Sequence, residues 1–286
     1  MSSPGATPNF STPELLVNAL GALPPTAQVL ARLQSLLADP NSDLGDVATL
    51  IRLDAAMTTR VIKISNSAWY KRGSPCQTID EAVNRIGFRE VFQLVSVVAA
   101  GALVAQPLAA YGRDATAMWR ESVSCAFAGE LLAECLGEDT AASFMNGLLH
   151  EIGRQAFNKY ATTTGKTIAD GGFPMDFSGA EFVLLGYTQA DAGACMLKKW
   201  NFTKENVEAI RHQYEPLEAA EPFDRLAAIL YGSRLLRTTV CSGQPVPEAP
   251  GEADVLATLR LTRDDVLAHL PSLTHKLARA EQIARI

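Results

Sequence analysis

A histidine and a carboxylate stand side by side near the middle of the chain, in the run 146–154, which reads NGLLHEIGR. The apolar residues 143–149 predict a helix that delivers His150 and Glu151 together, and Gly153 is expected to end or bend that helix. A neutral imidazole nitrogen beside an anionic oxygen is a donor pair that suits a divalent metal. The first question is therefore whether other segments supply the remaining ligands of a metal site.

Helices are expected to position this pair. Apolar residues recur with helical spacing along most of the chain, and the longest expected helices are 88–106 and 115–136. The sequence contains no sustained period-two alternation between hairpin turns and no repeat of fixed period. The sequence therefore predicts an all-α fold. Three pairs have the spacing of a capping box at a helix start: Thr78 with Glu81, Ser178 with Glu181, and Thr188 with Asp191. Thr262 with Asp265 is expected to start the last helices.

Size and composition are those of a folded protein. The chain has 286 residues, which exceeds the roughly 100–200 residues of a typical domain, so one large domain or two closely packed domains are expected. Hydrophobic residues make up 48% and charged residues 20%, which argues against disorder. The net charge of −6 gives an acidic surface that repels phosphates. General nucleic-acid binding is therefore disfavoured.

The five cysteines are widely spaced and form no C-x-x-C pair, which fits reduced thiols in a cytoplasmic protein. Residues 1–11 have neither the basic flank nor the apolar run of a signal peptide. The longest apolar run, 94–105, is shorter than the roughly 20 residues that a membrane-spanning helix needs. We therefore expect a cytoplasmic location and no membrane association.

Several segments, taken in order, resemble the motifs of the HDOD family, a divergent branch of the HD superfamily found in bacterial signalling and regulatory proteins. The segments are LPP at 23–25, LIRLDAAMTTRV at 50–61, ISNSAWY at 64–70, TIDEAVNRIG at 78–87, WRES at 119–122, GLLHEIG at 147–153 and AIRH at 209–212. Each motif alone is weak, but their order and spacing together are specific. The resemblance covers about residues 20 to 240 and implies a bacterial signalling module, usually without hydrolase activity.

The resemblance also implies how the helices are divided. An N-terminal helical subdomain, 12–110, would pack on an HD-like helical bundle, 111–240. The segment 107–114 is the best candidate for the boundary between them. Residues 1–11, rich in Ser, Pro, Gly and Asn, are expected to be a mobile tail. Residues 241–286 are expected to form a loop rich in proline and glycine, followed by C-terminal helices.

A catalytic relative in the HD superfamily needs a histidine from an earlier helix, an adjacent His-Asp pair and a further acid, and relatives with two metals add more histidines. One of the imidazole positions is a carboxylate in this chain, and two are amides, which are poor ligands for the metals that imidazole suits. The positions aligned on those ligands are, in chain order, Glu121, His150, Glu151, Gln189, His212 and Gln213.

Two interpretations of this set stay open. A mixed site of Glu121, His150, Glu151 and His212 would hold a single divalent metal. In the favoured interpretation no cofactor binds, and His150 and Glu151 bond to each other and cap helix ends. Glutamate in place of aspartate at 151 moves the carboxylate by roughly 1.5 Å, enough to misplace a ligand that binds at about 2 Å.

The favoured function is a non-catalytic regulatory module that acts through protein partners or as a sensor. The alternatives are a metal-dependent phosphohydrolase with an altered ligand set, and a small-ligand (nucleotide) binding module whose ligand occupies the pocket where catalytic HD relatives bind metal. Neither a phosphate-binding G-x-x-x-x-G-K loop nor a G-x-S-x-G nucleophile elbow occurs. Asn66, Ser67, Trp69 and Tyr70 are candidates for a contact surface, although such residues more often complete a helix end or the core. No oligomeric state is predicted.

Overall fold

The computed structural model describes residues 10–21, 25–38, 41–71, 73–171 and 176–284. Within these ranges the chain forms α-helices and two short 3-10 helices, and the only β-type pairing is one antiparallel bridge between Leu108 and Arg113. The prediction of an all-α fold is confirmed. Residues 1–9 of the expected tail, and residues 23 and 24 of the LPP motif, lie outside the described residues.

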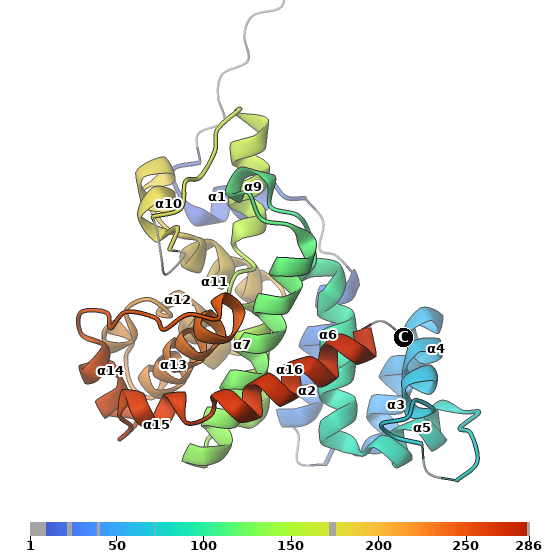
Figure 1. The fold of residues 1–286 in the computed structure, drawn as a ribbon. Helices are drawn as coiled ribbons and strands as arrows, with labels where there is room; N and C mark the ends of the chain where they lie inside the picture. The colour runs from blue at the N-terminus through green and yellow to red at the C-terminus, as the bar shows by residue number, and fades with distance from the viewer. Residues whose placement is uncertain (1–9, 22–24, 39–40, 72, 172–175, 285–286) are drawn as a thin grey trace, which may run out of the picture.

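The helices of the described residues are arranged along the chain as shown in Figure 1. They are α1 (Pro13–Asn18), α2 (Pro25–Ala38), α3 (Leu44–Arg52), α4 (Ala55–Ser65), α5 (Ile79–Ile86), α6 (Phe88–Val104), η1 (Ala109–Tyr111), α7 (Ala115–Leu136), α8 (Thr140–Leu149), α9 (Arg154–Thr163), α10 (Ser178–Leu185), α11 (Gln189–Lys199), α12 (Lys204–Arg211), η2 (Pro216–Glu218), α13 (Phe223–Ser242), α14 (Glu252–Thr258), α15 (Arg263–Leu267) and α16 (Leu270–Ala284).

Helix α7, the longest, is central to the packing, and α8 and α13 both lie against it. Two glycines let the backbones of α7 and α8 approach each other closely. A Cβ atom on Gly129 would come within 2.5 Å of the Ser143 carbonyl oxygen, and one on Gly147 within 2.3 Å of the Cys125 carbonyl oxygen. Because no side chain fits there, these glycines fix how close the helix that carries His150 lies to α7.

The connection at 107–114 has exposed residues, but buried side chains and hydrogen bonds anchor it to the rest of the molecule. Leu108 and Tyr111 are buried, the Ile168 amide donates to the Ala110 carbonyl at 2.8 Å, and the Ala110 amide donates to the Asn158 side chain at 2.9 Å. Helix α1 also lies against α9 and α11, which come far later in the chain. The two parts therefore share one continuous apolar core. The division into subdomains at about residue 110 stays a prediction.

Two of the three predicted capping boxes are confirmed, the third is wrong, and the helix start expected at Thr262 is also a capping box. Thr78, Thr188 and Thr262 each begin a helix with the reciprocal side-chain contacts of a capping box. Helix α10 has no such cap, because Glu181 is fully buried and accepts hydrogen bonds from Tyr111 and from the Gln189 amide. Long-range partners therefore outweigh the local cap that the spacing suggested.

The C-terminal residues pack back on the rest of the molecule. Helix α16, red in Figure 1, crosses α7 and reaches toward α4 and α6. Lys276 pairs with Glu130 of α7 at 2.8 Å, and Arg279 pairs with Glu90 of α6 at 2.8 Å.

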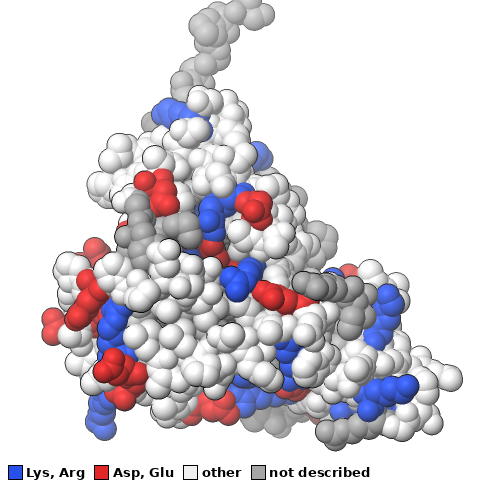
Figure 2. Space-filling model, viewed as in Figure 1, with Lys and Arg blue, Asp and Glu red and all other residues white. Residues whose placement is uncertain are grey.

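In the face drawn in Figure 2, acidic and basic residues are interspersed among broad uncharged areas. Among the described residues, no single helix is long and apolar enough to cross a membrane, although the bent pair α5 and α6 passes that test jointly.

Candidate functional site

The turn between α8 and α9 presents the His-Glu pair to the interior. Helix α8 ends at Leu149, His150 is its C-cap, and α9 begins directly after Gly153, as the sequence indicated. A Cβ on Gly153 would lie 2.0 Å from the Gln189 carbonyl oxygen. The absence of a side chain at this position therefore lets the turn lie directly against α11.

His150 is fully buried and electrically neutral. Its Nδ1 lies 2.7 Å from the Gly147 carbonyl oxygen, so Nδ1 carries the proton and donates to that oxygen. Burial lowers the pKa of His150 to about 4, although the Glu151 carboxylate opposes that shift. Its Nε2 lies 3.5 Å from the Glu151 carboxylate and has no hydrogen-bond partner in the described part of the chain. The two side chains are neighbours, as expected, but each has its closest partner elsewhere.

Glu151 is held by arginines. The Arg154 Nη1 atom lies 2.8 Å and the Arg237 Nη2 atom 3.2 Å from the same carboxylate oxygen. Burial alone would raise the pKa of Glu151, but these two guanidinium groups hold it well below its usual range. The carboxylate is therefore ionised inside the protein, and protein side chains supply its counter-charge.

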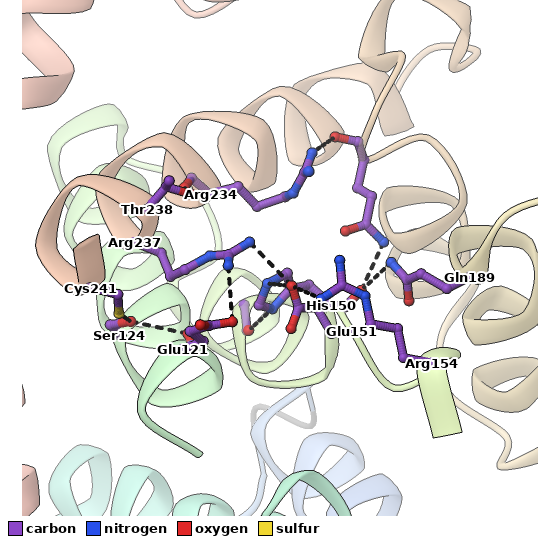
Figure 3. A network of polar contacts seen from close by, with 12 residues as sticks. Glu121, Ser124, His150, Glu151, Arg154, Gln189, Arg234, Arg237, Thr238 and Cys241 are labelled. Carbon is purple, nitrogen blue, oxygen red and sulfur yellow. Dashed lines mark hydrogen bonds and ion pairs between the residues drawn. The ribbon is translucent and has the colours of Figure 1, made fainter. Parts of the chain in front are cut away.

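Glu121 is bound in the same way. Arg113 pairs with one of its oxygens, and the Arg237 Nη1 atom lies 3.2 Å from the other. Arg237 of α13 thus bridges Glu121 of α7 and Glu151 of the α8–α9 turn, with one terminal nitrogen on each, as Figure 3 shows. The cation between these two carboxylates is a guanidinium group.

The network continues to a third buried acid, Glu181. It accepts a hydrogen bond from the Tyr111 hydroxyl at 3.0 Å and lies 3.6 Å from the Arg154 Nε atom. Burial raises the pKa of Glu181, and Arg154 works against that shift. The Arg154 guanidinium lies over the Phe177 ring at 4.8 Å and the Tyr111 ring at 5.5 Å. This stacking holds the plane of the guanidinium group, and the nitrogens at the edge of that plane face Glu151 and Glu181.

The two glutamines that stand at expected histidine positions have a structural role here. The Gln189 and Gln213 amide groups both donate to the His150 carbonyl oxygen, at 3.0 and 2.9 Å. Gln189 also donates to the Tyr214 hydroxyl at 3.0 Å. A carbonyl at a helix end has no partner inside its own helix, so these amides satisfy the end of α8.

The structure brings together three of the four candidate ligands. Glu121, His150 and Glu151 lie in one cluster, whereas His212, at the C-cap of α12, faces Glu208 of its own helix at 3.5 Å. Within the described residues no group of three or more His, Cys, Asp or Glu side chains is arranged to hold a metal. The cluster was incompletely predicted, because Arg113 and Arg237 were not singled out and Glu181 was assigned only to a helix cap. An arginine inside the apolar run of α13 was the available signal, since a buried charge needs a partner.

A metal of the kind that the HD superfamily implies does not fit this donor set. The oxygens of Glu121 and Glu151 already face three guanidinium groups, from Arg113, Arg154 and Arg237. A divalent cation would stand beside those positive charges, or would have to displace Arg237. Like charges at such distances repel strongly in a buried site.

The other candidate surface, at 66–70, is partly occupied by internal contacts. The Asn66 side chain accepts from the Cys76 amide at 2.7 Å and donates to its carbonyl at 2.9 Å, which pins the loop after α4. The Tyr70 hydroxyl donates to Glu90 at 2.6 Å, and the buried Ser67 hydroxyl has no hydrogen-bond partner among the residues that the structure describes. Trp69 is 46% exposed. A contact surface built on these four residues stays a prediction.

Comparisons with known proteins identify relatives of this chain in sequence and in fold. An uncharacterized protein of Treponema pallidum (strain Nichols) is 22% identical over 275 residues, which are 94% of this chain and 52% of that protein. This chain thus spans about half the length of that curated relative.

Two solved structures share the fold. The crystal structure of an HDOD domain protein of unknown function from Geobacter sulfurreducens has a TM-score of 0.72 at 19% identity, with 94% of this chain and 97% of that chain covered. A protein of Marinobacter aquaeolei VT8, provisionally described as a signal transduction protein, has a TM-score of 0.70 at 22% identity, with 96% and 61% covered. The sequence model of the HDOD domain matches residues 23–216, about two thirds of the chain, so this chain belongs to the HDOD family.

Proposed function

We propose that this chain is a non-catalytic regulatory module of the HDOD type that acts through protein partners. The observation that carries the proposal is the position of Arg237, whose guanidinium bridges Glu121 and Glu151. A metal-dependent phosphohydrolase needs a metal and an activated water at its carboxylate and imidazole ligands. Here an arginine supplies the positive charge between the carboxylates, and it carries no water that it could activate.

Burial of the cluster supports the same conclusion. His150 is fully buried, and Glu121 and Glu151 are each 4% exposed, so a phosphate ester would have no direct access to them. Removing one partner of a buried ion pair costs about 3–5 kcal/mol. A metal that displaced Arg237 would have to offset that cost before it could serve any reaction. The cluster is better suited to hold α7, the α8–α9 turn and α13 in a fixed arrangement.

Family membership and thiol chemistry support a role in signalling inside the cell. The Marinobacter protein with the same fold is provisionally described as a signal transduction protein. All five cysteines of this chain are free, as expected in the reducing cytoplasm, where we place the protein.

The test is a hydrolysis assay on the purified protein. Cyclic dinucleotides and nucleotide phosphates would be supplied with manganese, iron or magnesium, and the proposal predicts no turnover above the buffer control. The variant His150→Gln reports on the buried cluster, and His212→Gln is its matched control, because His212 is part-exposed and pairs with Glu208. Turnover by the unmodified chain that survives in His212→Gln and disappears in His150→Gln would establish a phosphohydrolase and end the proposal.

A further inference from the structure

A second site lies on the other side of α7 from the arginine–glutamate cluster. A cavity of about 550 Å³ opens between α4, α6, α7 and the C-terminal helix α16. This volume falls within the roughly 300–1,000 Å³ that small-molecule sites occupy. None of the residues of the buried arginine–glutamate cluster lines it. The cavity is therefore separate from the arginine–glutamate cluster around His150.

One wall of the cavity is apolar and includes a glycine. Leu94, Val97 and Val98 of α6 and Trp119 of α7 line it. Gly101, about one helical turn after Val97 and Val98 on α6, also lines the cavity, and a Cβ placed there would meet no atom within 4 Å. Val97, Val98 and Trp119 are only half-buried, so apolar surface remains available in the cavity for a ligand to cover.

The opposite wall, formed by α4 and α16, carries three cations. These are Arg60, Lys276 and Arg279. Arg279 pairs with Glu90 at 2.8 Å, and Lys276 pairs with Glu130 at 2.8 Å. Glu130 neutralises less of the positive charge at the cavity than Glu90 does, because Glu130 also pairs with Arg89 at 2.8 Å. Three cations thus face two carboxylates, one of which is shared.

Arg60 is the cation without a carboxylate partner among the described residues. Its guanidinium donates one hydrogen bond, to the Ala284 carbonyl at 3.3 Å, which leaves further N–H donors of its planar group for a ligand. A guanidinium group binds carboxylates in a bidentate manner more readily than an ammonium group does. The cavity therefore combines an apolar wall with an arginine that has no carboxylate partner among the described residues.

We propose that this cavity binds a single-chain amphipathic carboxylate of the fatty-acid class. The aliphatic chain lies against α6 and Trp119 of α7, and the carboxylate is bound by Arg60. Since Ile283 and Ala284 also line the cavity, the ligand bridges α16 to α6. The proposal does not depend on whether the chain lacks hydrolase activity.

The test uses dodecanoate as the probe, below its micelle concentration, with isothermal titration calorimetry on the full chain. The expected result is saturable binding of one molecule per chain, accompanied by a change in tryptophan fluorescence because Trp119 lines the cavity. A ligand that binds the folded state also raises the melting temperature. Absence of saturable binding would overturn the proposal.

Two variants locate the site. Gly101→Leu fills the cavity without meeting protein atoms at Cβ, and it removes a glycine from a helix, so the protein should fold at least as well. We expect dodecanoate binding to weaken by about tenfold or more in this variant. The matched control is Gly179→Leu on α10, which is also open at Cβ and does not line the cavity. Equal affinities of Gly101→Leu and the unmodified chain would contradict the assignment.

The head group is tested by Arg60→Gln. This variant should bind dodecanoate about tenfold more weakly, because the charge-assisted hydrogen bonds are lost. Dodecan-1-ol, which has the same chain and no charge, should bind both forms equally and more weakly than dodecanoate binds the unmodified chain. Equal binding of the two probes to the unmodified chain would refute the carboxylate assignment.

Discussion

Removal of the Arg237 guanidinium should destabilise the fold, because two buried carboxylates, Glu121 and Glu151, each lose one ion pair. In Arg237→Met the apolar part of the side chain is kept, while the nitrogens that lie 3.2 Å from Glu121 and from Glu151 are lost. All three side chains are at most 6% exposed. Breaking a buried pair costs about 3–5 kcal/mol because an uncompensated charge is left behind.

The expected loss lies at the lower end of that range. Glu151 keeps Arg154 and Glu121 keeps Arg113, so neither carboxylate is left without a counter-charge. We therefore expect the free energy of unfolding to fall by about 3 kcal/mol at pH 7, measured by urea denaturation with circular dichroism.

The loss should also depend on pH in a defined direction. Since the folded pKa of Glu151 is held below its usual range, its stabilising effect is present above the unfolded pKa of about 4.3 and is lost as the pH falls through the folded pKa. Arg237→Met weakens that effect, so its difference from the unmodified chain should be largest near pH 7 and should shrink below about pH 4.

Arg234→Met is the matched control for this substitution. Arg234 lies one helical turn earlier on α13, and its guanidinium donates to the Gln213 carbonyl at 2.9 Å and lies over the Tyr214 ring at 4.3 Å. Its removal should cost about 1 kcal/mol, without the pH dependence described for Arg237. A loss below about 1 kcal/mol in Arg237→Met, or equal losses in the two variants, would refute the reasoning about the bridged carboxylates.

Two further perturbations follow from the same part of the molecule. Because burial lowers the pKa of His150 to about 4, protonation of the unfolded chain should reduce stability as the pH falls from about 6.5 toward 4. The His150 contribution is about 2 kcal/mol between pH 7.5 and pH 5, and His150→Gln should remove it from urea unfolding curves at the two pH values; an unchanged pH dependence contradicts this. Gly147→Ala should destabilise the chain by about 3 kcal/mol, because its Cβ would lie 2.3 Å from the Cys125 carbonyl oxygen. Gly101→Ala, where the space is open, should instead stabilise it by about 1 kcal/mol; thermal unfolding of both variants checks the pair, and a neutral Gly147→Ala would show that the α7–α8 contact is loose.

Local patterns in the sequence were sufficient to predict most helices. The predicted helix at 115–136 coincides with α7, and the capping boxes at Thr78, Thr188 and Thr262 all form. Each of these signals lies within about one helical turn, so nearby residues alone determine the outcome. Glu181 shows the limit of such signals, because its partners Tyr111 and Gln189 come from other elements.

Two acids of the candidate site, Glu121 and Glu151, and its histidine were predicted, but the third acid, Glu181, and the cations Arg113 and Arg237 were not. The resemblance to HDOD motifs located Glu121, His150 and Glu151, because these residues lie within the segments 119–122 and 147–153 that carry it. Arg237 lies 86 residues after Glu151 in the sequence, and the packing of α13 against α7 and α8 brings the two side chains together. No local pattern encodes that packing, so the sequence left the counter-charge of the two carboxylates undetermined.

The most direct test of the central claim is an anomalous difference map from crystals soaked in manganese. Our account predicts no manganese peak between Glu121 and Glu151, with Arg237 in contact with both carboxylates. A peak coordinated by Glu121, His150 and Glu151, with the Arg237 side chain displaced, would contradict it.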